Sequence, residues 1–240
     1  MKNFKKYQPR EVNRRIISIE GLEKSGKTHW ALTAPGPIAY FNFDVGFEGV
    51  VDKFVDGTIS SKDVYIADYP APPAPENQSL YLNVWRKFWD DFTNALSQEE
   101  IRTLIVDTAT ECWEILRMGR FGKLSKVLPI NYGPLNAEFE YLFKTSYKHD
   151  KNVILIHRYT DEYINDKPTG KFKRAGYSKM GYVVQDVLRA HREENTADFS
   201  VSVLMSRKNI DKIGMEFEGD LSSFPYVMAG ITDTTPEEWS

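Results

Sequence analysis

The stretch Ser18-Ile19-Glu20-Gly21-Leu22-Glu23-Lys24-Ser25-Gly26-Lys27-Thr28 decides the fold. It contains the pattern G-x-x-x-x-G-K-T, and it continues the apolar run Ile16 to Ile19, which predicts a strand. Two glycines at this spacing let the backbone turn so that its N–H groups face inward, and the helix that follows adds its positive end. The stretch therefore predicts a cradle for phosphate oxygens.

The pattern also predicts what the side chains of the loop do. Lys27 extends to the β and γ phosphates as a point charge, and the hydroxyl of Thr28 ligates Mg²⁺. ATP and Mg²⁺ are therefore the predicted cofactors, and the alternative is a loop with incidental glycines. The residues predicted to surround the nucleotide are Gly21, Leu22, Glu23, Lys24, Ser25, Gly26, Lys27, Thr28 and His29.

Composition bounds the class of protein. With 240 residues and 41% hydrophobic content, the chain can bury a core and fits one α/β domain with elaborations. A net charge of −3 argues against a general binder of polyanions, so any nucleic-acid surface must be a local patch. The single cysteine, Cys112, excludes an internal disulfide and a thiol zinc cluster. No apolar run is long enough to span a bilayer, so we expect a protein of the cytoplasm that has no membrane partner.

Apolar periodicity predicts strands and helices in alternation. The resulting fold class is α/β, a mostly parallel sheet flanked by helices with an antiparallel C-terminal extension. Three parts are expected along the chain: a basic arm over 1–15, the main domain over 16–218 and a tail over 219–240, frayed from residue 232. Strands are expected over 16–19, 38–43, 62–69, 102–107, 152–157, 183–190, 199–205 and 213–217, and helices over 27–33, 79–96, 110–120 and 134–149.

Carboxylates follow two of the expected strands. Asp107 ends an apolar run about eighty residues after the phosphate loop, where a carboxylate holds the Mg²⁺ shell opposite Thr28. Asp44 ends the strand over 38–43, which we expect beside the strand that leads into the phosphate loop. Asp44 either orients the attacking water or caps a helix over 46–53, and Glu48 is its rival as water-activating carboxylate.

Taken together, these motifs resemble the RecA-like branch of the phosphate-loop ATPases. Gly21 to Thr28 is similar to the RecA-type loop, including the glutamate at its third position, and Asp107-Thr108 matches the Walker B aspartate with its hydroxyl neighbour. The resemblance implies a water-polarising carboxylate at Asp44. It also places His157 at a polar sensor position, on the tip of a strand inserted between the phosphate-loop strand and the Walker B strand.

More narrowly, the chain resembles short RecA-like ATPases of bacteriophages that act as single-strand annealing recombination proteins. The likeness covers most of residues 14 to 210 and includes Phe43 to Gly46, Tyr132 to Asn136 and Gln185-Asp186-Val187. Asp44 is shorter than the glutamate usual in full-length RecA, and Lys24 replaces a small polar residue. Because the chain is too short for the additional C-terminal domain of RecA, annealing is expected rather than full strand exchange, in the cytoplasm of a bacterial host if the protein is phage-encoded.

The resemblance implies two DNA-binding segments, one after the Walker B helix and one after the sensor strand. Both places are basic, and cations with interleaved aromatics suit single-stranded DNA, although a solvated charged loop remains the alternative. Residues 159–182 are expected to form a long loop, either functional or disordered. The predicted DNA-binding residues are Arg117, Arg120, Lys123 and Lys126 in the first segment, and Lys171, Phe172, Lys173, Arg174 and Lys179 in the second.

The sequence thus predicts a recombination ATPase that binds single-stranded DNA and assists annealing. We expect a homo-oligomer, a single-strand DNA-binding protein as a further partner, and Arg207 and Lys208 as a cationic finger that reaches a neighbour's nucleotide or, alternatively, as an exposed turn. Two other functions remain open: a nucleotide kinase-type phosphotransferase, and a helicase-loader or assembly module that uses ATP as a switch.

Overall fold

The computed structural model describes residues 14–44, 46–74, 76–123, 127–165, 167–193 and 198–240. Lys126 and most of the expected basic arm lie outside these residues. Arg14 and Arg15, the end of that arm, are fixed to the domain. Arg15 forms a buried ion pair with Asp186, and Arg14 donates a hydrogen bond to the backbone oxygen of Tyr147 at 2.8 Å.

One mixed sheet runs through the described part of the chain. Its order is β3-β2-β4-β5-β1-β7-β8-β9, with β6 paired to the outer half of β5. The strands from β3 to β7 in this order are parallel, and β8 and β9 pair antiparallel to their neighbours, as the sequence predicts. Strand β6 pairs antiparallel with β5, which the sequence does not predict. The strands are β1 (Ile16–Gly21), β2 (Ile38–Asn42), β3 (Val64–Asp68), β4 (Thr103–Asp107), β5 (Asn152–Ile164), β6 (Lys167–Arg174), β7 (Asp186–Arg192), β8 (Phe199–Ser206) and β9 (Glu216–Glu218).

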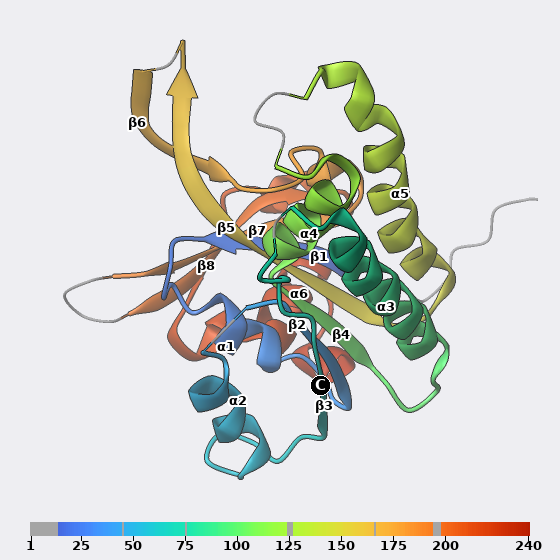
Figure 1. The fold of residues 1–240 in the computed structure, drawn as a ribbon. Helices are drawn as coiled ribbons and strands as arrows, with labels where there is room; N and C mark the ends of the chain where they lie inside the picture. Colours follow the sequence, from blue (N-terminus) through green and yellow to red (C-terminus); the bar gives the residue numbers. More distant parts are fainter. Residues whose placement is uncertain (1–13, 45, 75, 124–126, 166, 194–197) are drawn as a thin grey trace, which may run out of the picture.

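Helices cover both faces of the sheet and enclose two apolar cores. Helices α3 (Gln78–Ser97), α4 (Ala109–Phe121) and α5 (Tyr132–Thr145) pack together on one face (Figure 1). Helices α1 (Lys27–Leu32), α2 (Glu48–Val55) and α6 (Phe224–Thr232) contribute to the core of the other face. The central strands have apolar side chains on both faces because both faces are buried, as is usual in parallel sheets.

Helix α3 illustrates how spacing decides burial. Its aromatic residues recur at intervals of three and four positions, which places them on one side of the helix. Trp85, Phe88 and Phe92 accordingly have exposed fractions of 2%, 0% and 0%. These aromatic side chains therefore belong to the core and do not form an exposed stacking surface.

The strand order confirms one expectation and overturns another. Strand β5 lies between β1 and β4, as the resemblance implies. Strand β2, however, does not lie beside β1, because β4 and β5 separate the two strands. The expectation that Asp44 follows a strand adjacent to the phosphate-loop strand is therefore wrong.

Residues 159–182 are not one long loop. Strand β5 continues to Ile164 and pairs with β6 as an antiparallel hairpin, and the remaining residues form a short turn that leads to β7. Figure 1 shows this hairpin projecting beyond the sheet. The expectation of a long loop failed because the glycine and lysines of β6 give no strand pattern in the sequence. The strand forms through backbone pairing with β5.

The expectation of a frayed end from residue 232 onward is also wrong. Helix α6 packs on the core, and a turn of 3₁₀-helix over Pro236–Trp239 follows it. Trp239 is 3% exposed, contacts the ring of Phe224 and donates a hydrogen bond to Thr234. The acidic residues around Trp239 make this end of the chain look polar in the sequence, so its buried side chain is missed. The division of the chain at residue 218 stays a prediction.

Candidate nucleotide site

The phosphate loop connects β1 to α1 at the carboxyl end of the sheet. Gly26 has a φ of 90°, a conformation that side chains rarely adopt, and a Cβ there would lie 2.8 Å from the ring of Phe199. Within the described ranges, the backbone N–H groups of Glu23, Lys24 and Gly26 make no hydrogen bond. These free donors beside a glycine turn fit an anionic ligand such as a phosphate.

Lys27 folds back onto the loop. Its ammonium donates hydrogen bonds to the backbone oxygens of Gly21 and Leu22, at 3.1 and 2.5 Å. Burial lowers the pKa of Lys27 from its ordinary value, and the carboxylate of Asp107 opposes this change. A triphosphate in the loop offers this cation a better partner than two neutral carbonyls.

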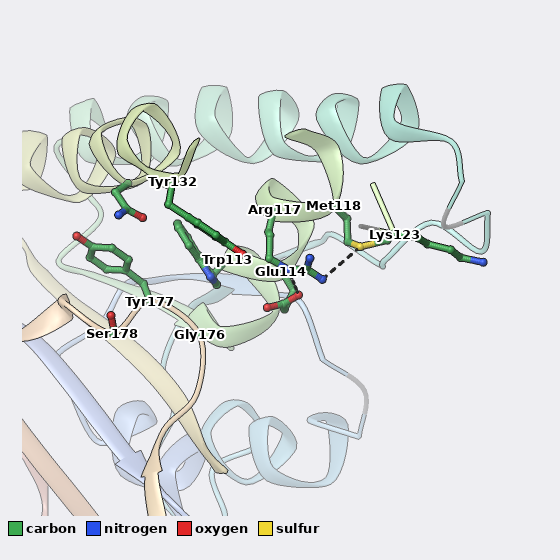
Figure 2. A pocket seen from close by; sticks show the side chains of 10 residues that line it. Trp113, Glu114, Arg117, Met118, Lys123, Tyr132, Gly176, Tyr177 and Ser178 are labelled. Atoms are coloured by element: carbon green, nitrogen blue, oxygen red, sulfur yellow. Dashed lines mark hydrogen bonds and ion pairs between the residues drawn. The ribbon is translucent and has the colours of Figure 1, made fainter. Parts of the chain in front are cut away.

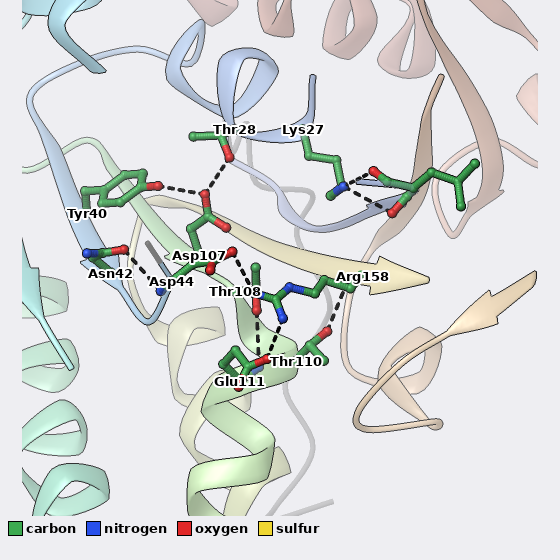
Figure 3. A network of polar contacts seen from close by, with 12 residues as sticks. Lys27, Thr28, Tyr40, Asn42, Asp44, Asp107, Thr108, Thr110, Glu111 and Arg158 are labelled. Atoms are coloured by element: carbon green, nitrogen blue, oxygen red, sulfur yellow. Dashed lines mark hydrogen bonds and ion pairs between the residues drawn. The ribbon is translucent and has the colours of Figure 1, made fainter. Parts of the chain in front are cut away.

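Asp107 and Thr28 meet, as the sequence predicts. The hydroxyl of Thr28 donates a hydrogen bond of 2.6 Å to Asp107 Oδ2 (Figure 3). The hydroxyl of Tyr40, from β2, donates a second hydrogen bond of 2.6 Å to the same oxygen. Burial raises the pKa of Asp107, whereas these two hydrogen bonds lower it.

This donor set fits Mg²⁺. A carboxylate and a hydroxyl are hard oxygen donors, and Mg²⁺ commonly takes one or two protein oxygens together with water and phosphate oxygens. Among the described residues, no three His, Cys, Asp or Glu side chains gather into a metal-binding group. A magnesium ion here would therefore be held by Thr28, Asp107 and the nucleotide, without a cage made only of protein.

Thr108 has a local structural role next to this site. Its side chain caps α4 by accepting a hydrogen bond from the backbone N–H of Glu111 at 3.2 Å. Such a cap satisfies one of the free donors of the first helical turn. The hydroxyl that follows the Walker B aspartate therefore fixes the direction of α4 relative to β4.

Asp44 does not cap a helix. Helix α2 begins at Glu48 with Phe47 at its cap position, so the capping alternative is wrong. The carboxylate of Asp44 instead lies 2.7 Å from the guanidinium of Arg158, which also contacts Glu111 at 2.6 Å (Figure 3). Glu48 is exposed and has no hydrogen bond or ion pair with these residues.

His157 does not stand at the tip of its strand, because β5 continues for seven more residues, to Ile164. Its side chain is fully buried, and neither ring nitrogen makes a hydrogen bond with the described residues. Burial, and second the nearby Arg174, lower the pKa of His157 to about 3, against a smaller opposing effect of the Ala175 backbone. The histidine is therefore neutral at ordinary pH, and its predicted sensing role stays a prediction.

His29, the last residue of the predicted nucleotide set, lies in the first turn of α1 and packs against α2. Its ring meets that of Phe54 edge-on, with centroids 5.0 Å apart. Burial lowers its pKa, and Lys53 and Arg192 add to this effect. Whether His29 touches a nucleotide stays a prediction.

The two segments predicted to bind DNA meet at a groove of about 740 Å³, and, among the described residues, the lysine and arginine side chains that line it all come from the first segment. Arg117 and Lys123 line it from the first segment, and residues 176–178 line it from the second (Figure 2). Tyr132, at the start of α5, completes one side. Segments that are far apart in the sequence are therefore neighbours.

Several of the predicted DNA-binding cations already have protein partners. Arg117 pairs with Glu114 at 2.7 Å, and Arg120 pairs with Glu138 at 2.5 Å. Arg174 is 14% exposed and pairs with Glu20. Lys171, Lys173 and Lys179 are exposed, Phe172 is 50% exposed, and the contacts of all these residues with DNA stay predictions.

Arg207 and Lys208 lie at the opposite end of the sheet from the phosphate loop. The backbone N–H of Arg207 donates to Gln185, just before β7, whereas the phosphate loop follows the last residue of the parallel strand β1. Both side chains are exposed, and Arg207 also donates to the backbone oxygen of Tyr182 at 2.5 Å. They therefore cannot reach the nucleotide of their own chain, and a role on a neighbour's nucleotide stays a prediction.

Sequence reasoning missed Arg158 and Tyr40. Both lie in strands whose apolar pattern gives no functional signal. Tyr40 reads as part of an apolar run, and Arg158 follows the histidine that attracted the sensor assignment. Only the register of the sheet shows that Arg158 belongs to the site, because Arg158 stands opposite Gly21 in the pairing of β1 with β5.

The profile of a family described as an AAA domain matches residues 13–218. The chain belongs to this AAA domain family. No curated protein matches the sequence. Among 169 matching chains of solved structures is the crystal structure of the RadB recombinase, with a TM-score of 0.53 and 13% identity over 86% of each chain.

At this identity, the likeness to RadB shows only the fold. The AAA domain described here thus has the architecture of a RecA-like phosphate-loop ATPase, which agrees with the strand order and the loop geometry. Within the residues that the structure describes, the AAA domain contains no helix able to cross a lipid bilayer.

Proposed function

We propose that this AAA domain hydrolyses ATP, binds single-stranded DNA and supports recombination of the phage type by strand annealing. One observation supports the DNA part of the proposal: Arg117 and Lys123 of the first segment line a groove whose opposite side is the turn 176–178 of the second segment. The turn of the second segment also packs on α4, since a Cβ at Gly176 would lie 3.2 Å from the backbone of Thr110. Helix α4 starts directly after the candidate metal ligand Asp107, so one helix links the groove to the nucleotide site.

The proposed hydrolysis uses four residues of the chain. Lys27 contributes its charge to the β and γ phosphates, and Thr28 and Asp107 would hold a magnesium ion that would supply further neutralisation of that charge. Asp44 is the carboxylate that orients the attacking water. It is favoured over Glu48 because Asp44 is held beside the site by Arg158.

Arg158 takes a sensing role in this proposal, beside the predicted sensor His157. Its charge contributes to lowering the pKa of Lys27, so the two cations lie near each other, and its strand adjoins the phosphate-loop strand. When a triphosphate arrives, the guanidinium exchanges Asp44 for a phosphate oxygen. The same step frees Asp44 to orient water.

The remaining parts of the proposal follow the family resemblance. A homo-oligomer brings Arg207 and Lys208 of one subunit to the nucleotide of the next, which their position at the far end of the sheet permits. A single-strand DNA-binding protein is the expected further partner.

ATPase measurements with and without single-stranded DNA, across a salt series, test this proposal. We expect DNA to stimulate turnover and the stimulation to weaken steeply with salt, because DNA binding releases counterions. Turnover that ignores DNA at every salt concentration contradicts the proposal and favours an ATP-switched assembly module. Transfer of phosphate to a nucleotide acceptor identifies a kinase instead.

A further inference from the structure

The turn that carries Asp44, the candidate water-orienting carboxylate, is held by hydrogen bonds to its backbone. The backbone N–H of Phe43 donates a hydrogen bond of 2.6 Å to the backbone oxygen of Asp107 in β4. The backbone N–H of Asp44 donates one of 3.2 Å to the side-chain oxygen of Asn42, the last residue of β2 (Figure 3). Whereas Arg158 holds the carboxylate of Asp44, Asn42 therefore holds the backbone that presents it.

The amide of Asn42 is oriented from the edge of the sheet. Its Nδ2 donates a hydrogen bond of 2.7 Å to Oδ1 of Asp68, which stands opposite Asn42 in the pairing of β2 with β3. Only the oxygen of an amide can accept from a backbone N–H, and only its NH₂ group can donate to a carboxylate. The two partners of Asn42 thus permit a single orientation of its amide. Without Asp68, the amide can turn over and bring its NH₂ group against the N–H of Asp44.

Burial differs between the two partners. Asn42 is 7% exposed, whereas Asp68 is exposed at the edge of the sheet. A buried amide needs hydrogen-bond partners, because unpaired polar atoms in the interior cost free energy. A carboxylate holds an NH₂ group more strongly than a neutral acceptor does. Since backbone pairing alone joins β3 to β2, the carboxylate of Asp68 serves the amide of Asn42 and is not needed to form the strand.

Asp68 lies far from the phosphate loop. Strand β3 is the outermost strand on its side of the sheet, and β2, β4 and β5 separate it from β1, which leads into the loop. Four strand spacings amount to ~19 Å. The carboxylate of Asp68 therefore does not touch a nucleotide held by the loop, and its influence on hydrolysis reaches the site through Asn42.

We propose that Asn42 and Asp68 are positioning residues for ATP hydrolysis: Asp68 fixes the amide of Asn42, and Asn42 fixes the turn that presents Asp44. The inference rests on the proposed hydrolysis and adds two residues that the proposed mechanism does not use. When Arg158 releases Asp44, the carboxylate rotates on a backbone that stays in place, so it reaches the attacking water with little rearrangement. A misplacement of about 1 Å at such a group can cost a factor of about 100 in rate.

Steady-state ATPase kinetics of the full chain, with Mg²⁺ and single-stranded DNA, test the contact between Asp68 and Asn42. Asp68→Ala removes the acceptor, and we expect its kcat to fall about 10-fold while its KM for ATP stays within about 2-fold of the parent. Asp68→Asn keeps an oxygen that accepts from Asn42, so it restores kcat to within about 2-fold of the parent. Asp63→Ala, at an exposed aspartate just before the same strand, is the matched control and turns over like the parent.

A pair of substitutions tests the role of Asn42. Asn42→Asp keeps an oxygen for the backbone N–H of Asp44 but sets a second carboxylate against Asp68, so we expect kcat to fall about 10-fold or more. Adding Asp68→Asn exchanges donor and acceptor and re-forms the hydrogen bond, which raises kcat about 5-fold above that of Asn42→Asp alone. Asp63→Asn in the same background gives no such rescue. Urea unfolding of every variant verifies that the fold is intact.

The outcomes separate this inference from the proposed function. If Asp44→Asn lowers kcat but Asp68→Ala and Asp63→Ala behave alike, the positioning role is wrong while the role of Asp44 stands. A change confined to the KM for ATP in Asp68→Ala likewise contradicts the positioning role. If the parent does not hydrolyse ATP, the proposed function itself fails.

Discussion

Arg158 and Asp44 form an ion pair of 2.7 Å that joins β5 to the end of β2 across the candidate nucleotide site. Neither residue lies in the phosphate loop, and the two strands are separated by β4. The pair holds the candidate water-orienting carboxylate against a cation, so breaking it changes where that carboxylate can point.

Arg158→Gln is expected to lower the turnover of ATP by about 10- to 100-fold, with a much smaller change in the KM for ATP. The variant removes a positive charge that we place on the transferred phosphate, and such groups act mainly in the transition state. Steady-state ATPase kinetics provide the measurement. Arg86→Gln, an exposed arginine on α3, serves as control. Unchanged turnover in Arg158→Gln contradicts the sensing role.

Tyr40→Phe tests the hydrogen bonds that surround Asp107. The tyrosine hydroxyl donates to the predicted metal ligand, and losing such an outer contact typically weakens metal binding by about 10- to 100-fold. We expect the magnesium concentration for half-maximal ATPase activity to rise accordingly. Tyr65→Phe, on the edge strand β3 and 57% exposed, leaves it unchanged. Equal magnesium dependence of both variants excludes this role for Tyr40.

His157 makes stability depend on pH below neutrality. Its pKa is about 3 in the folded chain and about 6.5 when unfolded, so only the unfolded chain takes up a proton between these values. Protonation then favours unfolding, and stability is lost as the pH falls below 6.5. By pH 5 the loss from this residue is about 2 kcal/mol relative to pH 7.

Urea unfolding at pH 7 and pH 5 measures this effect. His157→Gln has no titrating group at the position, so its stability should fall by about 2 kcal/mol less than that of the parent over the same interval. Parallel losses in the two proteins contradict a buried, neutral histidine.

The C-terminal turn is expected to contribute to global stability. Trp239→Ala removes a buried indole that contacts Phe224, and such truncations cost about 3 kcal/mol or more. Glu237→Ala alters an exposed neighbour and serves as control. Chemical unfolding measures both variants. A loss below about 0.5 kcal/mol for Trp239→Ala shows that the turn detaches without cost to the domain.

The sequence predicts the fold well where a short motif or a residue spacing is enough to determine the local structure. The phosphate loop is fixed by two glycines, a lysine and a threonine, and the pairing of Thr28 with Asp107 follows from the strand that carries each. The aromatic spacing of α3 places its buried face correctly.

Predictions fail where the deciding contact lies far away in the chain. Strand β6 exists because β5 offers it a paired backbone, and its own residues do not indicate a strand. Arg158 becomes a site residue only through the register of β5 against β1, and Trp239 becomes core only because α6 brings it to Phe224. Such information is absent from any short window of sequence.

The two glycines of the phosphate loop have a consequence for shortened versions of the protein. A Cβ at Gly21 would lie 2.5 Å from the backbone oxygen of Ala190, and one at Gly26 would meet Phe199. The antiparallel pair β7–β8 thus packs directly against the loop and restricts the path of its backbone. A fragment that stops before residue 199 keeps every residue of the phosphate-loop motif but loses β8, one of the two strands that pack against the loop. A minimal nucleotide-binding unit must therefore extend through β8.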